Sequence, residues 1–448
     1  MANWKKRLFS SLVLLPLLGM LAFAAPGAQP SLRPLRIQAT DAAGEPVSGL
    51  RVLILPADGS SAICGDSPAS KGRAETGVSG IYEAGRYEAG RSYTVTLANT
   101  YSRPVSEQSH TFRLEKGEQP YPLALRWEQE KPETSLAKIP QKLVLHVVDE
   151  KGEPVRGLYA RGGREHPAYP DGTEKVHPGT DGQLGFTDFS GRLIFVDPAI
   201  DSYTLSFNYP PAEEGGAEQT FSVPYSGGSR EYTLPLLENP PQPGAYADPK
   251  EYPLRDVAIR VLDPSGNAVP DVVASALPLK TEETKDSASP LPLRAKKTNR
   301  DGIYRAQAAI YGSYALTLKN NLSTPVYTQK HRLFVQPFQG TQLHTVIFAG
   351  EPPLTTLEKR SQKLVLFFKR AALEPANGLR VEVRKSETGR LVSDGWTDYE
   401  GKYILLEFEP AAYELWVEDE GKGLSGRYAI DATGGTDLSF TLSWPPQS

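Results

Sequence analysis

The chain has 448 residues, with 49 Lys and Arg against 53 Asp and Glu, so its formal net charge is −4. The two signs are interspersed and form no basic stripe, which argues against a nucleic-acid partner. Cys64 is the single cysteine, so an intramolecular disulfide is excluded and stability must come from hydrophobic cores.

The first 25 residues have the pattern of a secretory signal peptide. Basic residues 5–7 precede an apolar run from Leu8 to Ala25, and the small residues of Ala22-Phe23-Ala24 suit cleavage. The alternative is a membrane anchor, but Pro16 and Gly19 interrupt a run that is already short for a bilayer span. No later stretch is long and apolar enough to cross a membrane. We therefore expect an exported chain, periplasmic or extracellular, with no membrane span after the signal.

Four segments in chain order each predict a β-hairpin. Each has an alternating apolar run, a turn rich in Gly, Pro, Asp or Asn, and a second run, which is the pattern of strand, turn and strand. The segments begin at Leu35, Leu143, Val257 and Leu364.

A glycine and a tyrosine follow each hairpin at similar spacing. We expect the glycine to adopt a turn conformation that a Cβ atom would hinder, and the tyrosine to bury its ring while its hydroxyl reaches a partner. The pairs are Gly80 and Tyr93, Gly191 and Tyr203, Gly302 and Tyr314, and Gly401 and Tyr413.

The second half of the chain repeats the first at one fixed offset. The run Gln141 to Leu145 returns verbatim as Gln362 to Leu366, and Asn99 returns as Asn320, so that 362 − 141 = 320 − 99 = 221. The offset also spans a connector, in which Pro132 corresponds to Pro353. A matching connector indicates duplication of a two-domain segment.

These patterns predict an all-β chain of four tandem antiparallel β-sandwiches, since no long stretch has helical periodicity. The predicted domains are residues 31–128, 140–238, 253–349 and 362–448, a suitable size for single sandwiches. The connectors are rich in Pro and charged residues, so we expect extended, stiff spacers that bury little surface between the domains. A rod is the expected shape.

The repeated motif resembles the prealbumin-like (Ig-like) sandwich superfamily, which includes Cna protein B-type repeats and the carboxypeptidase regulatory-like domain. The motif begins with a strand that ends in Asp, followed by a turn and the sequence G-E-P-V-x-G-L. After it come a T-D-x-x-G-x-Y motif and a strand that begins with Tyr. The first motif covers residues 41–50, 149–158 and 263–272. The fourth copy is degenerate, with Arg370 in place of the Asp and Leu373 in place of the turn Gly.

The resemblance raises the question of an amide crosslink, because many Cna B-type repeats join a Lys to an Asn or Asp beside a buried acid. The positions of the Lys hold Ala39, Val147, Val261 and Phe368, and those of the acid hold Leu97, Phe207, Leu318 and Val417. We therefore expect no crosslink in any domain. Lys369 is one residue out of phase and should point to the opposite side of its strand.

The same superfamily also includes intradiol dioxygenases and transthyretin-related hydrolases. The resemblance to the dioxygenases would require a close His pair and two Tyr as iron ligands, but the six His residues are scattered. They are His110, His146, His166, His177, His331 and His344. The Tyr-Arg-Gly-Ser ending typical of the hydrolases is missing too. We expect no enzymatic activity, no catalytic residue and no cofactor.

The loop from Arg161 to Asp181 is the longest predicted insertion. It contains His166, Tyr169, Asp171, Glu174 and His177, from which a metal site could be drawn. The two His residues are 11 positions apart, a separation that fits no compact ligand spacing. We expect no metal site here, and a contact role is the better interpretation of an exposed loop.

Trp396, Trp416 and Trp444 concentrate aromatic side chains near the C-terminus. On alternating strands such residues are usually core, although exposed ones could form a platform for sugar rings. We interpret the chain as a non-catalytic, exported binding or scaffolding protein of the bacterial cell envelope, with an envelope protein or polysaccharide as partner. The alternatives are a carbohydrate-binding or regulatory accessory of an envelope enzyme and a surface adhesin.

Overall fold

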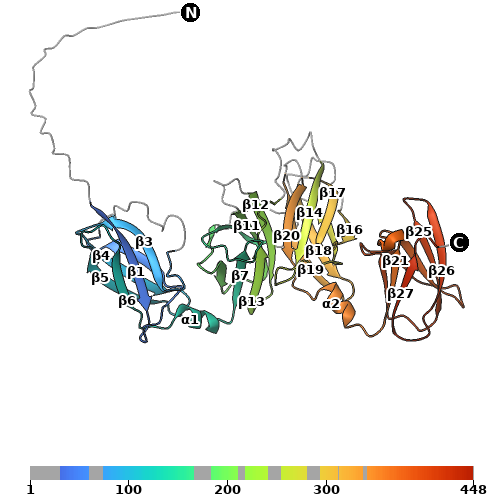
Figure 1. The fold of residues 1–448 in the computed structure, drawn as a ribbon, viewed down its shortest axis with the longest axis horizontal. Coiled ribbons are helices and arrows are strands. Elements are labelled where there is room, and N and C mark those ends of the chain that lie inside the picture. The colour runs from blue at the N-terminus through green and yellow to red at the C-terminus, as the bar shows by residue number, and fades with distance from the viewer. Residues whose placement is uncertain are drawn as a thin grey trace, which may run out of the picture.

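The structure, a computed structural model, describes residues 31–59, 74–165, 183–209, 217–240, 254–279, 293–310, 312–336 and 341–446. The predicted signal peptide and Cys64 lie outside these residues. The described part of the chain contains four large hydrophobic cores. The strands around them follow one another along the long axis of the molecule (Figure 1). We call the strands around these cores units 1 to 4, in chain order.

Unit 1 is a sandwich of two three-stranded sheets, with strand orders β3-β1-β6 and β2-β4-β5. Its strands are β1 (Leu32–Thr40), β2 (Arg51–Pro56), β3 (Ile81–Glu88), β4 (Ser92–Asn99), β5 (Ser106–Arg113) and β6 (Tyr121–Arg126). Its core includes Tyr82, Tyr93 and Trp127.

Unit 2 has one separate sheet, β10-β7-β13, whereas its second sheet continues into unit 3. The strands of unit 2 are β7 (Lys142–Val148), β8 (Tyr159–Glu165), β9 (Gln183–Phe186), β10 (Arg192–Val196), β11 (Asp201–Tyr209), β12 (Ala217–Tyr225) and β13 (Ser229–Pro235).

Unit 3 completes this seven-stranded sheet, whose order is β17-β14-β20-β12-β11-β8-β9, and adds the sheet β16-β15-β18-β19. Its strands are β14 (Leu254–Leu262), β15 (Val273–Pro278), β16 (Leu293–Lys297), β17 (Ile303–Ile310), β18 (Gly312–Asn320), β19 (Tyr327–Val335) and β20 (Thr341–Ile347).

Unit 4 has the sheets β24-β21-β27 and β23-β22-β25-β26. Its strands are β21 (Lys363–Lys369), β22 (Arg380–Lys385), β23 (Leu391–Trp396), β24 (Lys402–Leu406), β25 (Ala412–Asp419), β26 (Leu424–Asp431) and β27 (Asp437–Ser443), with a short 3-10 turn, η4 (Ala371–Leu373).

The predicted all-β sandwich fold is confirmed, with two corrections. The four predicted hairpins do not form, because the two strands of each segment lie in opposite sheets: β1 and β2, β7 and β8, β14 and β15, and β21 and β22. The second correction concerns the strand directions. In every unit the first strand pairs with the last in parallel: β1 with β6, β7 with β13, β14 with β20, and β21 with β27. The penultimate strand of each unit belongs to the opposite sheet. The chain therefore crosses between the sheets before its last strand, and the sheet that holds the first and last strands of each unit is mixed.

The repeated glycine and tyrosine have the roles that the sequence predicts. Gly80, Gly191, Gly302 and Gly401 all have φ near +70°, and an added Cβ atom would lie within 2.7 Å of a carbonyl oxygen of the first strand in each unit. Only glycine fits this position. The four tyrosine rings are buried, and the Tyr203 hydroxyl donates to the Ala199 carbonyl at 2.8 Å.

The prediction of extended connectors is wrong for two of them. Helix α1 (Pro132–Lys138) lies between units 1 and 2, and helix α2 (Pro353–Glu358) between units 3 and 4. Each begins with the proline that suggested an extended spacer, because proline at the first position of a helix has no amide hydrogen to leave unpaired and a fixed φ that suits the helix. Residues 241–253 of the middle connector lie outside the described part of the chain.

The shared sheet predicts that unfolding of units 2 and 3 is coupled. Tyr314→Ala should destabilise unit 3 by about 3–5 kcal/mol, because it removes a large buried ring, and unit 2 should lose stability with it. The matched control, Tyr93→Ala, removes the corresponding ring from unit 1 and should leave units 2 and 3 unchanged. Thermal unfolding followed by hydrogen exchange of individual peptides separates the units. Unchanged protection of unit 2 peptides in Tyr314→Ala would contradict the coupling.

Candidate functional site at the junctions between the sandwiches

The junction of units 2 and 3 is a continuous β-sheet. Strand β12, at the edge of unit 2, pairs in parallel with β20, at the edge of unit 3, through Thr220 with His344, Phe221 with Thr345, and Ser222 with Val346. A second contact joins the Thr233 amide to the Pro264 carbonyl at 2.8 Å. Backbone hydrogen bonds therefore hold the two sandwiches edge to edge, which removes two open strand edges.

An apolar pair explains why this junction forms a core. Leu262 and Ile347 are the last residue pair of the β14–β20 ladder, and both are fully buried within the hydrophobic core of unit 2. The corresponding last pairs of the other parallel ladders are Thr40 with Arg126, Val148 with Pro235, and Lys369 with Ser443. Only unit 3 has two large apolar side chains here, so only its edge can extend the core of a neighbour.

Glu165, at the end of β8, is the buried carboxylate of this junction. Its Oε1 accepts a hydrogen bond from the Thr204 hydroxyl, and its Oε2 accepts one from the Arg332 amide of unit 3, both at 2.8 Å. Burial raises the pKa of Glu165. The opposite effects of the nearby His331, the Arg332 amide and the Ser222 hydroxyl are together larger, so the pKa lies below its usual value. An ionised carboxylate thus joins unit 2 to the backbone of unit 3.

Two buried histidines line the unit 3 side of the junction. His331 Nδ1 lies 3.6 Å from Glu165 Oε2, which is beyond hydrogen-bond distance, and its Nε2 contacts the Gln329 amide at 2.5 Å. Burial lowers the pKa of His344 to about 4. His344 is therefore neutral at physiological pH, and its Nε2 is buried without a hydrogen-bond partner among the described residues.

Each helical connector is fixed to the preceding sandwich by a buried asparagine. Asn99 Nδ2 donates to the Glu130 carbonyl and to the Ser135 hydroxyl of α1. Asn320 Nδ2 makes the same two bonds, to Glu351 and to Thr356 of α2. The two asparagines are the pair that the 221-residue offset identifies, so the repeated motif is the anchor of the connector.

The connectors also contact the units that follow them. Tyr101 of unit 1 and Leu136 of α1 form a small cluster with Ile194 and Val196 of unit 2. After α2, the Arg360 guanidinium donates to the Leu322 carbonyl of unit 3 at 2.6 Å, and the Lys363 ammonium of unit 4 donates to the Arg360 carbonyl at 3.0 Å. Units 1 and 4 are thus attached through short, hydrogen-bonded segments.

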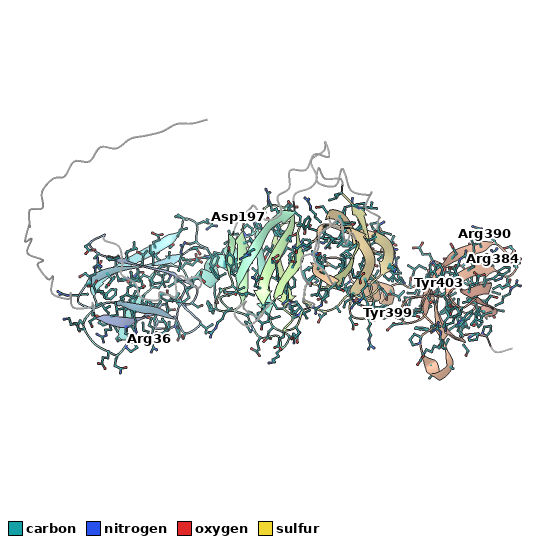
Figure 2. All side chains as sticks on the ribbon, turned by 90° about the horizontal axis from the view of Figure 1, so that it is seen from above. Arg36, Asp197, Arg384, Arg390, Tyr399 and Tyr403 are labelled. Carbon is teal, nitrogen blue, oxygen red and sulfur yellow. The ribbon has the colours of Figure 1, made fainter. Side chains whose placement is uncertain are left out.

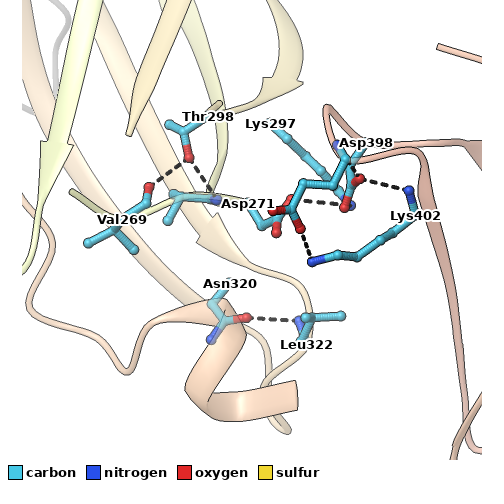
Figure 3. Close-up of polar contacts among 10 residues, drawn as sticks. Val269, Asp271, Lys297, Thr298, Asn320, Leu322, Asp398 and Lys402 are labelled. Carbon is cyan, nitrogen blue, oxygen red and sulfur yellow. Dashed lines mark hydrogen bonds and ion pairs between the residues drawn. The ribbon is translucent and has the colours of Figure 1, made fainter. Parts of the chain in front are cut away.

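Units 3 and 4 meet through two carboxylates. Asp271 of unit 3 and Asp398 of unit 4 face each other with buried side chains, and the Lys297 ammonium lies 3.8 Å from Asp271 Oδ1 and 4.0 Å from Asp398 Oδ2 (Figure 3). Tyr399 lies at the end of unit 4 that faces unit 3 (Figure 2). Both Asp271 Oδ1 and Asp398 Oδ2 are buried without a hydrogen-bond partner among the described residues.

The backbone of Asp271 marks this contact as unusual. Its φ is +63°, and the other units have glycine at the same motif position, namely Gly49, Gly157 and Gly378, with φ from 67° to 74°. An L-residue there is strained, although Asp tolerates it better than most. Burial and the Asp398 charge raise the pKa of Asp271 to about 6, whereas Lys297 and Lys402 oppose the shift. Unit 3 thus replaces a favourable glycine by a carboxyl that reaches unit 4.

The loop predicted for contacts lies almost entirely outside the described residues. His166, Tyr169, Asp171, Glu174 and His177 belong to residues 166–182, and the interpretation of the loop stays a prediction. Within the described ranges, no group of three or more His, Cys, Asp or Glu side chains could hold a metal ion. No helix of these ranges is long and apolar enough to cross a bilayer.

The positions discussed for a crosslink all lie in the cores. All eight side chains at the Lys and acid positions are buried, with exposed fractions of 0 or 1 %. Phe368 belongs to the core of unit 4, and Lys369, the next residue, is half-buried and pairs with Ser443. An apolar side chain has no amine or carboxyl group, so these positions serve packing alone.

The three tryptophans of unit 4 differ in environment. Trp444 belongs to the core, as predicted, but Trp396 is 52 % exposed. Trp416 lies on the outer face of the four-stranded sheet, with the guanidinium carbons of Arg427 and Arg384 at 4.0 and 5.1 Å from its ring centroid. Cation–π contacts therefore occupy the Trp416 ring, which leaves Trp396 as the exposed ring of the three.

Comparison with known proteins gives remote structural likenesses. No family model matches the chain, and no curated protein matches it. The TIE protein of Bacillus anthracis is 11 % identical, with a TM-score of 0.16 over 93 % of this chain and 69 % of its own. The shaft pilin SpaA of Lactobacillus rhamnosus GG is 12 % identical, with a TM-score of 0.18 over 44 % of this chain and 98 % of its own. TM-scores and sequence identities as low as these support no conclusion about the function of this chain.

The raised pKa of Asp271 predicts that the contact between units 3 and 4 weakens as the pH rises. The protonated carboxyl is favoured when the contact is closed. Its contribution to the stability of the contact is therefore complete below pH 3.8 and is lost as the pH rises through about 6. Asp271→Asn keeps a neutral polar side chain that tolerates positive φ. The variant should gain stability on the order of 2 kcal/mol at pH 8 and almost none at pH 4.

Thermal unfolding of both proteins between pH 4 and pH 8 measures this difference. The control is Asp256→Asn, which neutralises an exposed carboxylate of the same unit and should not change the pH profile. An equal effect of Asp271→Asn at both ends of the range would show that Asp271 is ionised throughout.

Proposed function

We propose that this chain is an exported, non-catalytic scaffolding protein of the bacterial cell envelope, made of domains 31–128, 140–238, 253–349 and 362–448. Its task would be to hold binding surfaces at fixed separations along an elongated body. The resemblance to prealbumin-like repeats, including the Cna B-type repeats, suggests the bacterial setting. An envelope protein or polysaccharide is the proposed partner.

The observation that carries the proposal is that every junction is structured. A flexible string of domains needs only free linkers, but here one junction is a shared sheet with a shared core, and the other two are helices fixed by Asn99 and Asn320. The buried Glu165 carboxylate accepts its hydrogen bond from the Arg332 amide only when units 2 and 3 hold this arrangement. Residues that fix the junctions in this way are expected in a protein whose function depends on the spacing of its units.

The carbohydrate-binding alternative receives less support. A sugar platform needs aromatic rings with free faces, and the guanidinium groups of Arg384 and Arg427 contact the Trp416 ring. Trp396 alone has an exposed ring on this sheet. A single ring is a weak platform for a polymer of sugars.

Export is tested by fractionating a bacterial host that produces the full chain. We expect the protein in the periplasm or the medium, with a new N-terminus near residue 25, because the predicted signal peptide directs secretion and is then removed. A variant without residues 1–25 is the control and should stay in the cytoplasm. Uncleaved full-length protein in the cytoplasmic fraction would contradict the export half of the proposal.

A further inference from the structure

Unit 3 has a groove on the outer face of β14, β17 and β20, its three strands of the shared sheet, beside unit 2. The groove has a volume of about 640 Å³, a size that suits a small ligand or a short stretch of a polymer. Its floor includes Ala258 and Leu343 of the sheet, and Leu237 of unit 2 lines one side. The groove therefore belongs mainly to unit 3, and unit 2 closes it on one side.

Three arginines from separate segments converge on this groove. Arg260 comes from β14, Arg305 from β17, and Arg300 from the turn between Asn299 and Gly302. None of the three forms an ion pair or a side-chain hydrogen bond with another residue of the described ranges. Asp301 is the single acidic residue in the lining, so the groove carries an excess of positive charge in a protein that is acidic overall.

Arg260 carries the partly buried share of this charge, whereas Arg300 and Arg305 are exposed. Its Nη1 atom is buried and has no hydrogen-bond partner among the described residues. Burial lowers the pKa of its guanidinium, against the effect of the nearby Glu150 carboxylate, but an arginine stays charged under these conditions. A buried donor of a charged group without an acceptor is unfavourable, and a bound anion would supply the acceptor.

The same face of unit 1 does not have this arrangement. In unit 3, Ala258 of β14 lies directly across from Arg305 of β17. The equivalent cross-strand pair of unit 1 is Arg36 and Glu83, whose side chains form an ion pair at 2.6 Å. The corresponding rungs of units 2 and 4 hold Val144 with Ile194 and Val365 with Ile404. The uncompensated arginines are therefore specific to unit 3 and are not a property of the repeated fold.

We propose that this arginine groove, lined by Arg260, Arg300 and Arg305, binds the oxyanion groups of an anionic ligand, either carboxylates or phosphates. Guanidinium groups bind both in a bidentate manner, and the apolar floor would contact the body that carries the anionic groups. The proposal goes beyond the scaffolding function, because it assigns a ligand class to one place on the body.

The experiment is calorimetric titration of the mature full chain with two anionic probes at low salt. Hexagalacturonate supplies carboxylates, tripolyphosphate supplies phosphates, and neutral maltohexaose is the control for sugar without charge. We expect saturable binding of one ligand per chain with at least one anionic probe and none with maltohexaose. Raising the salt from about 20 mM to about 500 mM should weaken the binding, because it shortens the screening length.

Variants show whether the groove is the site. Arg260→Gln should weaken binding about tenfold or more, the usual effect of losing a charge-assisted hydrogen bond. The double variant Arg300→Gln and Arg305→Gln changes two exposed side chains and gives the same test if Arg260→Gln does not fold. Arg36→Gln, at the matched face of unit 1, should bind as the unaltered protein does.

The proposal is wrong if neither anionic probe binds saturably, or if the double variant binds as tightly as the unaltered chain. An equal loss of affinity in Arg36→Gln would also overturn it, because it would indicate general attraction of anions. The relative affinities for the two probes separate carboxylate from phosphate as the recognised group. None of these results depends on whether the chain is exported.

Discussion

The parallel pairing of β12 with β20 is the constraint on which the middle of the molecule depends. Without it, two sandwiches would each leave a strand edge open, and Glu165 at the end of β8 would lose its hydrogen bond from the Arg332 amide. With it, Leu262 and Ile347 complete the core of unit 2, and a groove forms where Leu237 meets the outer sheet of unit 3. One edge contact thus joins two cores, and a buried carboxylate and a groove lie beside it.

The internal duplication explains why the three junctions are of two kinds. The repeated segment contains two sandwiches and a helical connector, so Asn99 and Asn320 recur with their hydrogen bonds to the connector. The junction between the two copies has no counterpart in the chain. It therefore depends on residues that differ from their equivalents in the first copy. Ile347 stands where unit 1 has Arg126, and Leu262 stands where unit 1 has Thr40.

Sequence patterns predicted the features that depend on neighbours along the chain. The turn glycines and strand tyrosines follow from local backbone and packing rules, and Leu373 does replace a turn glycine, with φ of +63°. The helices α1 and α2 were missed because they are too short for helical periodicity, although Pro132 and Pro353 are good first residues of a helix.

The junction residues could not be predicted because their partners are distant in sequence. The Arg332 amide that pairs with Glu165 is 167 positions away, and no local pattern brings them together. Asp271 is different, since an Asp stands where three units have glycine, and that departure from the motif was a visible sign of an unusual backbone. The arginine groove had no such sign, because Arg260, Arg300 and Arg305 converge only in the folded sheet.

These features together describe an elongated body with fixed junctions, a contact between two carboxylates near one end and a positively charged groove at its centre. Small-angle scattering of the mature chain tests the elongated shape most directly. Each sandwich of about 100 residues has a radius of gyration of about 13 Å. With about 35 Å between units 1 and 2 and between units 3 and 4, and about 20 Å across the shared sheet, whose strands lie about 4.8 Å apart, the overall radius of gyration is near 35 Å, whereas a single globule of this length gives about 22 Å. A measured value near 35 Å, independent of protein concentration, is the expected result. A value below about 28 Å would contradict the account, because the sandwiches would then fold back on one another.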